Sequence, residues 1–393
     1  MTLQKLKKES YRWLISAVVV VAQTGHNGWI SLFAYPLSVS ESILIVYYSI
    51  KNMRASVLTD VEEMTVMERR RPEPGSQEVL IRVGATGVCM TDYHTYHGSL
   101  QVEKPVILGH EIAGTVAAVG NNVTDHDLGD RVAVNPIVSC GTCSACIRGN
   151  THLCEKNTSI GGAGENVIDG AFSEFVCVPA ATVEDIGDLS FTQAALAEPL
   201  GCCVHGMDRS GLEQGDSAAI IGAGPIGLMI LQTLRNRGIA PIAVAEPDDY
   251  RRKLAADLGA DVIVDPNKRD TVQIVEKEIG DVDAGIEVVG KVQTIKQAYT
   301  MTAKGGTALI FGVPGQEAMM NINPFDIYFR EIDIHGTYAL SQESFERALT
   351  LLRNDRINTD LIITEEIGLA DIPEAFDKMA NNNGLKKVIA PNK

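Results

Sequence analysis

Four cysteines lie close together near the middle of the chain, at Cys140, Cys143, Cys146 and Cys154. Their spacing lets four thiolates surround one ion tetrahedrally with no open coordination position, which is typical of a structural zinc site. An iron–sulfur cluster also uses four cysteines, but its tight spacing commonly ends in Cys-Pro, whereas Cys154 precedes Glu155. Disulfides are the other alternative, although the cysteines are closer together than is usual for them. The pattern therefore predicts a structural zinc ion.

A second set of residues suited to metal binding is scattered along the chain. Cys89 stands in the segment Gly-Val-Cys-Met-Thr-Asp-Tyr-His, His110 and Glu111 are adjacent, and Glu198 precedes a proline. Each residue alone has an ordinary explanation as a core or surface residue. Together, a thiolate, an imidazole and a carboxylate suit a zinc site with a position open to water or an alcohol. The set is therefore a candidate catalytic centre.

A third pattern is typical of dinucleotide binding. The apolar run 217–221 predicts a buried strand, and 228–237 predicts a helix that ends before Gly238. The first glycine of the turn between them permits a sharp bend, the second lets a pyrophosphate approach the backbone, and the third lets helix and strand pack closely. The residues of this turn that we expect at the cofactor are Gly222, Gly224, Pro225, Ile226 and Gly227.

An acidic residue follows the next predicted strand at the expected distance from the turn. The strand 242–245 ends at Glu246, whose carboxylate would accept hydrogen bonds from the hydroxyls of an adenosine ribose. Asp248 and Asp249 would repel a 2′-phosphate, so the sequence favours NAD. Arg251, which we also place at the cofactor, and Arg252 lie close enough to offer a phosphate site, so NADP stays open as an alternative.

The elements that must position these residues fall into two patterns. Short β-type runs between Gly, Pro and Asp extend over 53–183 and predict a small β-rich, barrel-like domain. Strand, turn and helix then alternate over 205–310, which predicts a parallel sheet covered by helices. The C-terminal part predicts helices at 342–353 and 373–379 and a closing strand at 387–390.

Residues 1–52 have a composition of their own, with basic residues followed by apolar runs that superficially match a secretion signal. The second apolar run contains Pro36 and Glu41 and is a poor membrane span. Export would also carry a thiolate metalloprotein into an oxidising compartment. We expect the functional chain to begin near Met53, with residues 1–52 an extension from an upstream start. A membrane anchor and an arm for oligomer contacts are the alternatives.

The charge of the chain excludes some classes of function. The 393 residues carry a net charge of −16, and 45% of them are apolar, which is typical of a globular protein of two domains. An acidic surface repels phosphate backbones and anionic lipid, so roles in binding nucleic acid or a membrane surface are disfavoured. The same argument disfavours a module that binds nucleic acid through the cysteine segment. Adaptation to high salt is another reading of the acidity. The clustered thiols suit a reducing cytoplasm.

The order and spacing of these motifs make residues 53–393 similar to the zinc-containing medium-chain alcohol dehydrogenase family, in particular its polyol (sorbitol-like) and threonine dehydrogenase branch. The motifs are those described above together with Gly129-Asp-Arg-Val132. The resemblance implies an α/β fold, with a GroES-like β-barrel catalytic domain at 53–205, a doubly wound Rossmann domain at 206–338, and a return to the catalytic domain at 339–393.

The resemblance also implies roles for the scattered residues. Cys89 and His110 would be direct zinc ligands, Glu111 a ligand or a hydrogen-bond partner of the metal's water, and Glu198 a fourth, exchangeable ligand. With the four-cysteine site, the chain would then hold two zinc ions.

The resemblance places Thr91 beside the substrate oxygen and His94 on a proton path to solvent, although His94 is also readable as a plain surface residue. The expected reaction is hydride transfer from a secondary alcohol, a polyol or a sugar, to NAD. Threonine or butanediol oxidation and a catalytically silent zinc-binding relative are the alternatives. A zinc-free reductase of the same fold would need neither cysteine set. A homotetramer or homodimer is expected. Cys202 and Cys203 are expected to be apolar fillers that could line the substrate pocket.

Overall fold

The computed structural model describes residues 52–393. The predicted N-terminal extension therefore lies outside the described residues, apart from Asn52. By their contacts, residues 55–67 and 72–393 form one compact unit, which contains every predicted site residue. Within the described part of the chain, no helix is both long enough and apolar enough to cross a membrane.

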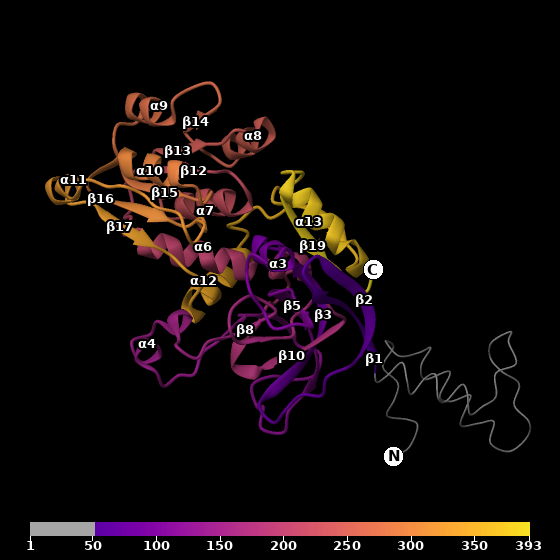
Figure 1. Ribbon diagram of the computed structural model, residues 1–393. Coiled ribbons are helices and arrows are strands. Elements are labelled where there is room, and N and C mark those ends of the chain that lie inside the picture. The colour runs from indigo at the N-terminus through magenta and orange to yellow at the C-terminus, as the bar shows by residue number, and fades with distance from the viewer. Residues whose placement is uncertain (1–51) are drawn as a thin grey trace, which may run out of the picture. The chain divides into compact units, whose positions relative to one another are not determined.

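The first half of this unit is rich in short strands (Figure 1). The largest sheet here has the order β11-β6-β5-β3-β19-β18, with β10 also paired to β3, and two three-stranded sheets have the orders β2-β1-β4 and β7-β8-β9. The strands are β1 (Asn52–Asp60), β2 (Glu63–Arg70), β3 (Glu78–Gly87), β4 (Val106–Ile107), β5 (Glu111–Val119), β6 (Arg131–Val134), β7 (Ile137–Val138), β8 (Thr158–Ile160), β9 (Val167–Ile168), β10 (Phe175–Pro179) and β11 (Val183–Asp185).

The long strands β3 and β5 form the centre of this lobe. They pair antiparallel from Val79 opposite Val119 to Gly87 opposite Glu111. Alternate residues of β3, including Val79, Ile81 and Val83, enter one apolar core. This alternation is the pattern of a strand with one face on a core, and it fixes the register that brings the start of β5 beside the end of β3.

Short helices connect these strands and lead out of the lobe. They are α3 (Met90–Tyr96), α4 (Ser144–Ile147), α5 (Phe191–Ala195) and the longer α6 (Ala197–Arg209), with 3-10 turns at Thr151–Leu153 and Ala180–Thr182.

The second half contains a six-stranded sheet in the order β14-β13-β12-β15-β16-β17, in which every pairing is parallel. This is the doubly wound order, with the first strand in the middle. The strands are β12 (Ala218–Ile221), β13 (Ile242–Ala245), β14 (Val262–Val264), β15 (Val282–Glu287), β16 (Thr302–Ile310) and β17 (Asp333–Gly336).

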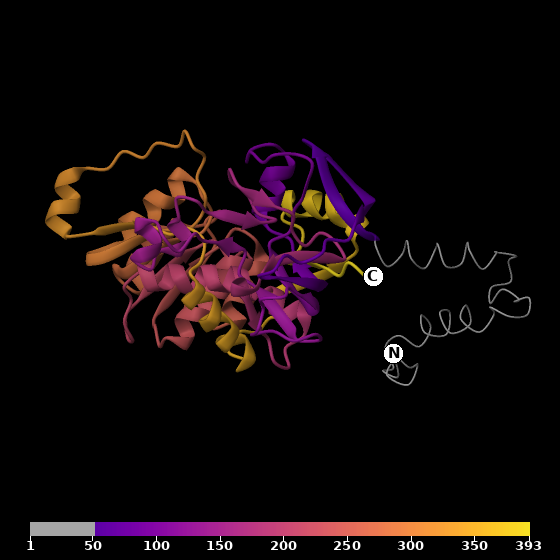
Figure 2. The same cartoon turned by 90° about the horizontal axis from the view of Figure 1, so that it is seen from below.

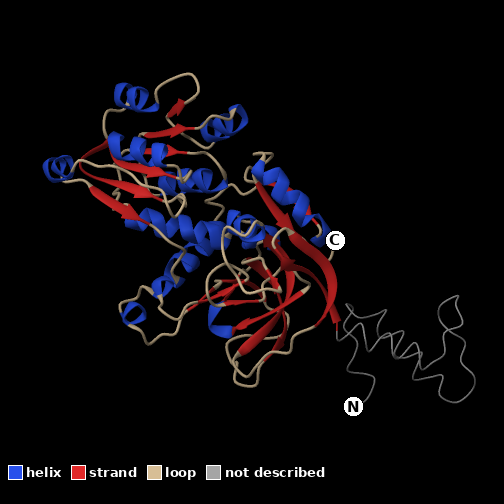
Figure 3. Ribbon diagram, in the orientation of Figure 1, coloured by secondary structure: helices blue, strands red, loops and turns tan. Residues whose placement is uncertain are grey.

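Helices cover both faces of this parallel sheet (Figure 3). Ala218 and Ile220 of β12 enter one apolar core, and Ala219 and Ile221 enter another on the opposite face. The segment between β16 and β17 loops away from the sheet and carries a helix without buried residues, α11 (Figure 2). The helices of this half are α7 (Pro225–Asn236), α8 (Asp249–Asp257), α9 (Thr271–Glu278), α10 (Val292–Met301) and α11 (Pro324–Arg330).

The C-terminal segment returns to the first lobe, as the yellow β19 beside the indigo strands shows (Figure 1). β19 pairs antiparallel with the end of β3, where Val388 lies opposite Gly87. Lys386 thereby comes close to the beginning of β5. The elements of this segment are α12 (Gln342–Arg353), β18 (Ile363–Ile367), a 3-10 turn at Leu369–Asp371, α13 (Ile372–Ala380) and β19 (Lys386–Ile389).

The structure confirms the predicted fold class and corrects several details. The strand at 242–245 and the helix at 342–353 have the predicted bounds, whereas α7 begins three residues before the predicted helix. Helix α6 was not predicted, because Pro199, Gly201 and Gly206 weaken the helical pattern. The domain boundaries remain predictions.

Candidate catalytic metal and cofactor site

The four clustered cysteines converge in the structure. The sulfur of Cys146 lies 4.0 Å from that of Cys140 and 3.5 Å from that of Cys143, and the sulfurs of Cys143 and Cys154 are 3.9 Å apart. Thiolates around one tetrahedral zinc ion, each about 2.3 Å from it, stand roughly 3.8 Å apart. The cluster therefore has the dimensions of a closed zinc site.

Backbone amides of the same segment point at these sulfurs. Cys154 accepts from the amides of Cys140 and Lys156, each at 3.3 Å. Hydrogen bonds from the side chain and amide of Thr142, and from the amide of Cys143, lower the pKa of Cys140 to about 5. Such donors stabilise thiolates, which are the form that binds a metal.

The scattered residues also converge. The ligand atoms of Cys89, His110 and Glu111 all lie within 4.8 Å of one another. Cys89 is the N-cap of α3, where its sulfur accepts from the amide of Thr91 at 3.5 Å. His110 follows Gly109, whose φ of +95° suits glycine, and Glu111 begins β5. A helix start and a strand start therefore present the three ligand types to one point.

Asp92 supports two of these residues, although we did not single it out from the sequence. One of its oxygens accepts from the amide of Cys89 at 2.9 Å, and the other lies 3.3 Å from Nδ1 of His110. Burial would lower the pKa of His110, but the charges of Asp92 and Cys89 raise it well above its ordinary value. Asp92 is thus the charged partner of the imidazole and makes it more basic, although Oδ1 of Asp92 and Nδ1 of His110 do not have the geometry of a hydrogen bond. Its place three residues after Cys89, where it closes a capping box, was a usable signal.

Glu111 has one oxygen paired and one without a partner. Its Oε1 forms an ion pair with Lys386 of β19, and both side chains are buried. Its Oε2 is buried without a hydrogen-bond partner, and a Cβ added at Gly87 would collide with it. A buried carboxylate oxygen without a donor is costly unless a cation supplies the charge, so the residues present fit a metal ion. Lys386 lies 275 residues away, and no local pattern predicted it.

Glu198 lies on α6 at the edge of this cluster. Its carboxylate is not in the group that converges within 4.8 Å, and Oε1 accepts instead from the thiol of Cys202 at 3.6 Å. Burial is the main cause that raises its pKa to about 7, with the charge of His110 opposing the rise and that of Glu111 adding to it. The carboxylate of Glu198 is therefore close enough to feel the charges of His110 and Glu111, but it lies outside the group of converging ligand atoms.

The two residues predicted for proton transfer lie on the same short helix as Cys89. Thr91 and His94 both belong to α3 and are partly buried. Burial lowers the pKa of His94, and the neighbouring His97 lowers it further. An imidazole that is neutral near pH 7 is able to accept a proton.

Four histidines outside the candidate site contact other protein groups. His97 lies 2.6 Å from a carboxylate oxygen of Glu62, and His126 lies 3.2 Å from the carbonyl oxygen of Ala180. His152 and His205 pack against each other in a T-shaped contact with ring centroids 4.4 Å apart.

The glycine turn has the geometry that the sequence predicts for a dinucleotide cradle. Gly222 has a φ of +106°. A Cβ added at Gly227 would collide with the carbonyl oxygen of Gly222, so helix and turn can approach only with glycine there. A Cβ at Gly224 would meet no atom within 4 Å, which leaves space beside the start of α7. Pro225 begins that helix, and Ile226 follows.

Glu246 lies beside this turn. Its carboxylate accepts from the amides of Ala223 at 2.7 Å and Asp248 at 3.0 Å. Arg251 donates to the carbonyl oxygen of Gly384 at 3.1 Å. Arg252 is buried, donates to the carbonyl oxygen of Glu246 at 2.6 Å and pairs with Asp249. Both arginines therefore already have protein partners.

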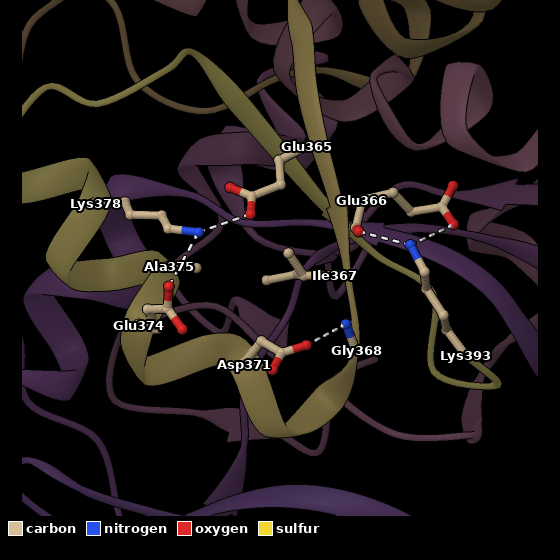
Figure 4. Close-up of a pocket in the computed structure, with 9 residues that line it drawn as sticks. All are labelled: Glu365, Glu366, Ile367, Gly368, Asp371, Glu374, Ala375, Lys378 and Lys393. Atoms are coloured by element: carbon tan, nitrogen blue, oxygen red, sulfur yellow. Dashed lines mark hydrogen bonds and ion pairs between the residues drawn. The ribbon is translucent and has the colours of Figure 1, made fainter.

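A cavity of about 360 Å³ lies elsewhere, between β18, α13 and the C-terminus (Figure 4). Its charges satisfy one another: Lys378 pairs with Glu365 and Glu374, and Lys393 lies 3.6 Å from Glu366. None of the predicted site residues lines it.

Comparison with known proteins agrees with this arrangement. Residues 75–188 match the alcohol dehydrogenase GroES-like domain, and residues 225–354 match the zinc-binding dehydrogenase family. The chain is 33% identical to sorbitol dehydrogenase of Bacillus subtilis (strain 168) over 353 residues, which cover 87% of this chain and 98% of that protein. It is 35% identical to L-threonine 3-dehydrogenase of Thermococcus kodakarensis, over 82% of this chain and 93% of that protein.

A solved structure has the same fold throughout its length. A protein of Sinorhizobium meliloti 1021, described as a zinc-binding dehydrogenase and solved bound to NADP, superposes with a TM-score of 0.82 at 35% identity. The match covers 86% of this chain and 99% of that one. The chain therefore belongs to the zinc-containing medium-chain alcohol dehydrogenases, in the branch that includes polyol and threonine dehydrogenases.

Proposed function

We propose that this protein oxidises a secondary alcohol, a polyol or sugar, to a ketone by transferring hydride to NAD. The observation that carries the proposal is the convergence of Cys89, His110 and Glu111 on one point within 4.8 Å. One thiolate, one imidazole and one carboxylate are a donor set that suits zinc with an exchangeable position. The glycine turn of the parallel sheet supplies a site for the cofactor.

The residues present give each part of the site a role. Cys89 and His110 hold the metal, Glu111 binds it or its water through the unpartnered Oε2, and Glu198 is the exchangeable fourth ligand. When bound, zinc acts as a Lewis acid that lowers the pKa of the substrate hydroxyl. Lys386 pairs with Glu111 and holds its carboxylate in place.

The proton leaves along α3 in this proposal. Thr91 is the hydroxyl group that contacts the substrate oxygen and accepts its proton while passing its own onward. His94 lies one turn of helix further along and receives the proton as a neutral imidazole, because burial keeps its pKa low. The partial exposure of His94 lets it exchange that proton with solvent.

The partners of the arginines favour NAD over NADP. A 2′-phosphate needs a cationic group that is free to approach it. Arg252 is engaged by Asp249 and by Asp265 at 3.2 Å, and Arg251 is bonded to the turn at Gly384. The carboxylate of Glu246 beside the turn suits the two ribose hydroxyls instead.

Carboxylates around the metal support a polyol substrate. Glu111 and Glu198 give the site more oxygen character than a set of thiolates would, which suits substrates with neighbouring hydroxyls. Threonine and butanediol are the alternative substrates. We further propose that the clustered cysteines hold the second of two zinc ions, and that the protein is a cytoplasmic homotetramer or homodimer.

The test combines metal counting with turnover. Purified protein is analysed for zinc by mass spectrometry, and NAD reduction is followed at 340 nm with polyols, sugars, butanediol and threonine. We expect two zinc ions per chain, turnover of at least one polyol, and a lower KM for NAD than for NADP. Protein that holds both ions and binds NAD but reduces it with no alcohol would instead identify a silent relative.

A further inference from the structure

The adjacent cysteines of α6 have different environments. Cys202 follows Glu198 by four residues, so the two side chains lie one above the other on the same face of the helix. The sulfur of Cys202 lies 3.6 Å from Oε1 of Glu198. Cys203 is fully buried and donates to the carbonyl oxygen of Ile226 on α7 at 3.8 Å. Only the first of the two thiols therefore faces the metal ligands.

The bond from Cys202 holds Glu198 in a particular place. The other three ligand residues converge within 4.8 Å of one another, and the carboxylate of Glu198 stays outside that group. Oε2 of Glu111, which is buried without a partner, marks where a cation would lie. Because Oε1 of Glu198 accepts a hydrogen bond from the thiol of Cys202, this carboxylate is less available as a metal ligand. The thiol and the metal therefore compete for Glu198.

We propose that Cys202 is a positioning residue that holds the carboxylate of Glu198 in its detached position and so keeps the fourth coordination position open for substrate. The inference deepens the proposed function and rests on it. Without the thiol, Glu198 loses the donor that favours detachment, and the balance moves toward coordination. The substrate hydroxyl must then displace a carboxylate that is bound more of the time.

This role predicts a particular division between kinetic constants. A thiol is a weak hydrogen-bond donor, so the loss of its bond to the carboxylate should change an equilibrium by about fivefold. Cys202→Ala should therefore raise KM for the alcohol about fivefold, because the fourth position is occupied more often. The value of kcat should change by less than about twofold, since the reacting groups are untouched once substrate is bound. Release of the metal to a competing chelator should become slower.

The decisive measurement is the visible spectrum of the protein with Co²⁺ in place of zinc, because it reports the number and type of ligands without turnover. The difference between the parent and Cys89→Ser isolates the signal of this site from that of the cysteine cluster. We expect the visible bands of Cys202→Ala to differ from those of the parent before alcohol is added, because a carboxylate then occupies the fourth position more of the time. Cys202→Ser, which retains a donor, should return both the spectrum and KM toward the parent.

The neighbouring thiol provides the matched control. Cys203→Ala removes a sulfur from the core without touching Glu198, so its thermal unfolding should change while its Co²⁺ spectrum and KM stay those of the parent. A parent-like spectrum and KM in Cys202→Ala would overturn the inference, and so would equal changes in Cys202→Ala and Cys203→Ala. If the parent and Cys89→Ser have the same cobalt spectrum, the proposed catalytic site itself is wrong.

Discussion

The two groups of metal-ligand residues differ in how the chain builds them. The cluster at 140–154 draws all four sulfurs from one short segment, whose own amides donate to them. The other group takes Cys89 from the start of α3, His110 and Glu111 from the start of β5, and Glu198 from α6, and its support includes Lys386 from the last strand. One site is local and the other depends on the whole sheet.

The two sites owe their stability to different sources. A segment with four thiolates and short elements has little core of its own, so its shape depends on the ion. The scattered group lies on strands and helices that pack against large apolar cores. Its geometry should therefore persist without a metal, because the surrounding fold positions the ligands.

The largest expected effect contrasts one variant in each site. Cys89→Ser should lower kcat by at least about 10³, because it removes the ligand of the Lewis acid. NAD affinity, measured by fluorescence titration, should remain within about twofold, since the glycine turn is distant in sequence and separately built. Thermal unfolding of this variant should stay close to that of the parent.

Cys143→Ser should behave in the opposite way. Its sulfur lies 3.5 Å from that of Cys146, so the closed tetrahedral set is lost with it. We expect one zinc ion fewer per chain, a lower midpoint of thermal unfolding and increased proteolysis within 140–154, with kcat retained within about tenfold. Retention of full turnover by Cys89→Ser, or complete loss of it in a folded Cys143→Ser, would contradict the assignment of one catalytic and one structural site.

The next effect concerns the buried ion pair of the scattered site. Lys386→Met leaves the buried carboxylate of Glu111 without its cation, and removing one partner of a buried pair costs about 3–5 kcal/mol. The free energy of unfolding, measured in urea, should fall by that order. The double variant with Glu111→Gln should recover most of the loss, since no charge is then left unpaired. A single variant as stable as the parent would mean that the metal alone compensates Glu111.

The sequence predicted the local features of this molecule better than the distant ones. The cysteine cluster, the glycine turn and the strand at 242–245 are encoded by residues that are neighbours in the chain, and the structure brings each set together as expected. Asp92 was also predictable from the sequence, because it lies in the same motif as Cys89. These are the features for which spacing alone restricts the geometry.

The distant features depended on pairings that one sequence does not reveal. Lys386 reaches Glu111 only because β19 pairs with β3, a register that no local pattern indicates. The position of the Glu198 carboxylate likewise depends on Cys202, which lies one helical turn further along α6. This helix was not predicted, because its proline and glycines weaken the helical pattern. The resemblance to a known family, rather than spacing, supplied the grouping of Cys89, His110, Glu111 and Glu198.

A smaller expected effect is the pH dependence of the free energy of unfolding, which tests whether the scattered site keeps its geometry without metal. Burial raises the pKa of Glu198 in the folded chain to about 7, above its ordinary value of 4.5. Its contribution to stability is therefore fully present below pH 4.5 and is lost as the pH rises through about 7, a change of at most roughly 3 kcal/mol. Metal-depleted protein should lose stability over this range in urea titrations.

Glu198→Gln is the matched variant for this measurement. Its amide carries no charge at any of these pH values, so the variant should lack this part of the slope and exceed the metal-depleted parent in stability near pH 8. Addition of zinc should remove the advantage, because the ion favours the charged carboxylate. Identical slopes in the two proteins would show that the carboxylate reaches solvent when the metal is absent.

The smallest expected effect tests the glycine turn as a second locally encoded site. A Cβ at Gly227 collides with the carbonyl oxygen of Gly222, so Gly227→Ala should lower the free energy of unfolding by about 1–3 kcal/mol.

A Cβ at Gly224 meets nothing within 4 Å, and the backbone there has a φ of −68° that alanine adopts. Gly224→Ala should therefore unfold like the parent and yet bind NAD more weakly, because the methyl group occupies the space left for the pyrophosphate. Urea unfolding and NAD titration of the two variants separate packing from cofactor contact. Equal NAD affinity in Gly224→Ala and the parent would mean that the cofactor does not approach the turn. The turn would then resemble the cysteine cluster only in being folded by neighbouring residues, and not in binding a ligand.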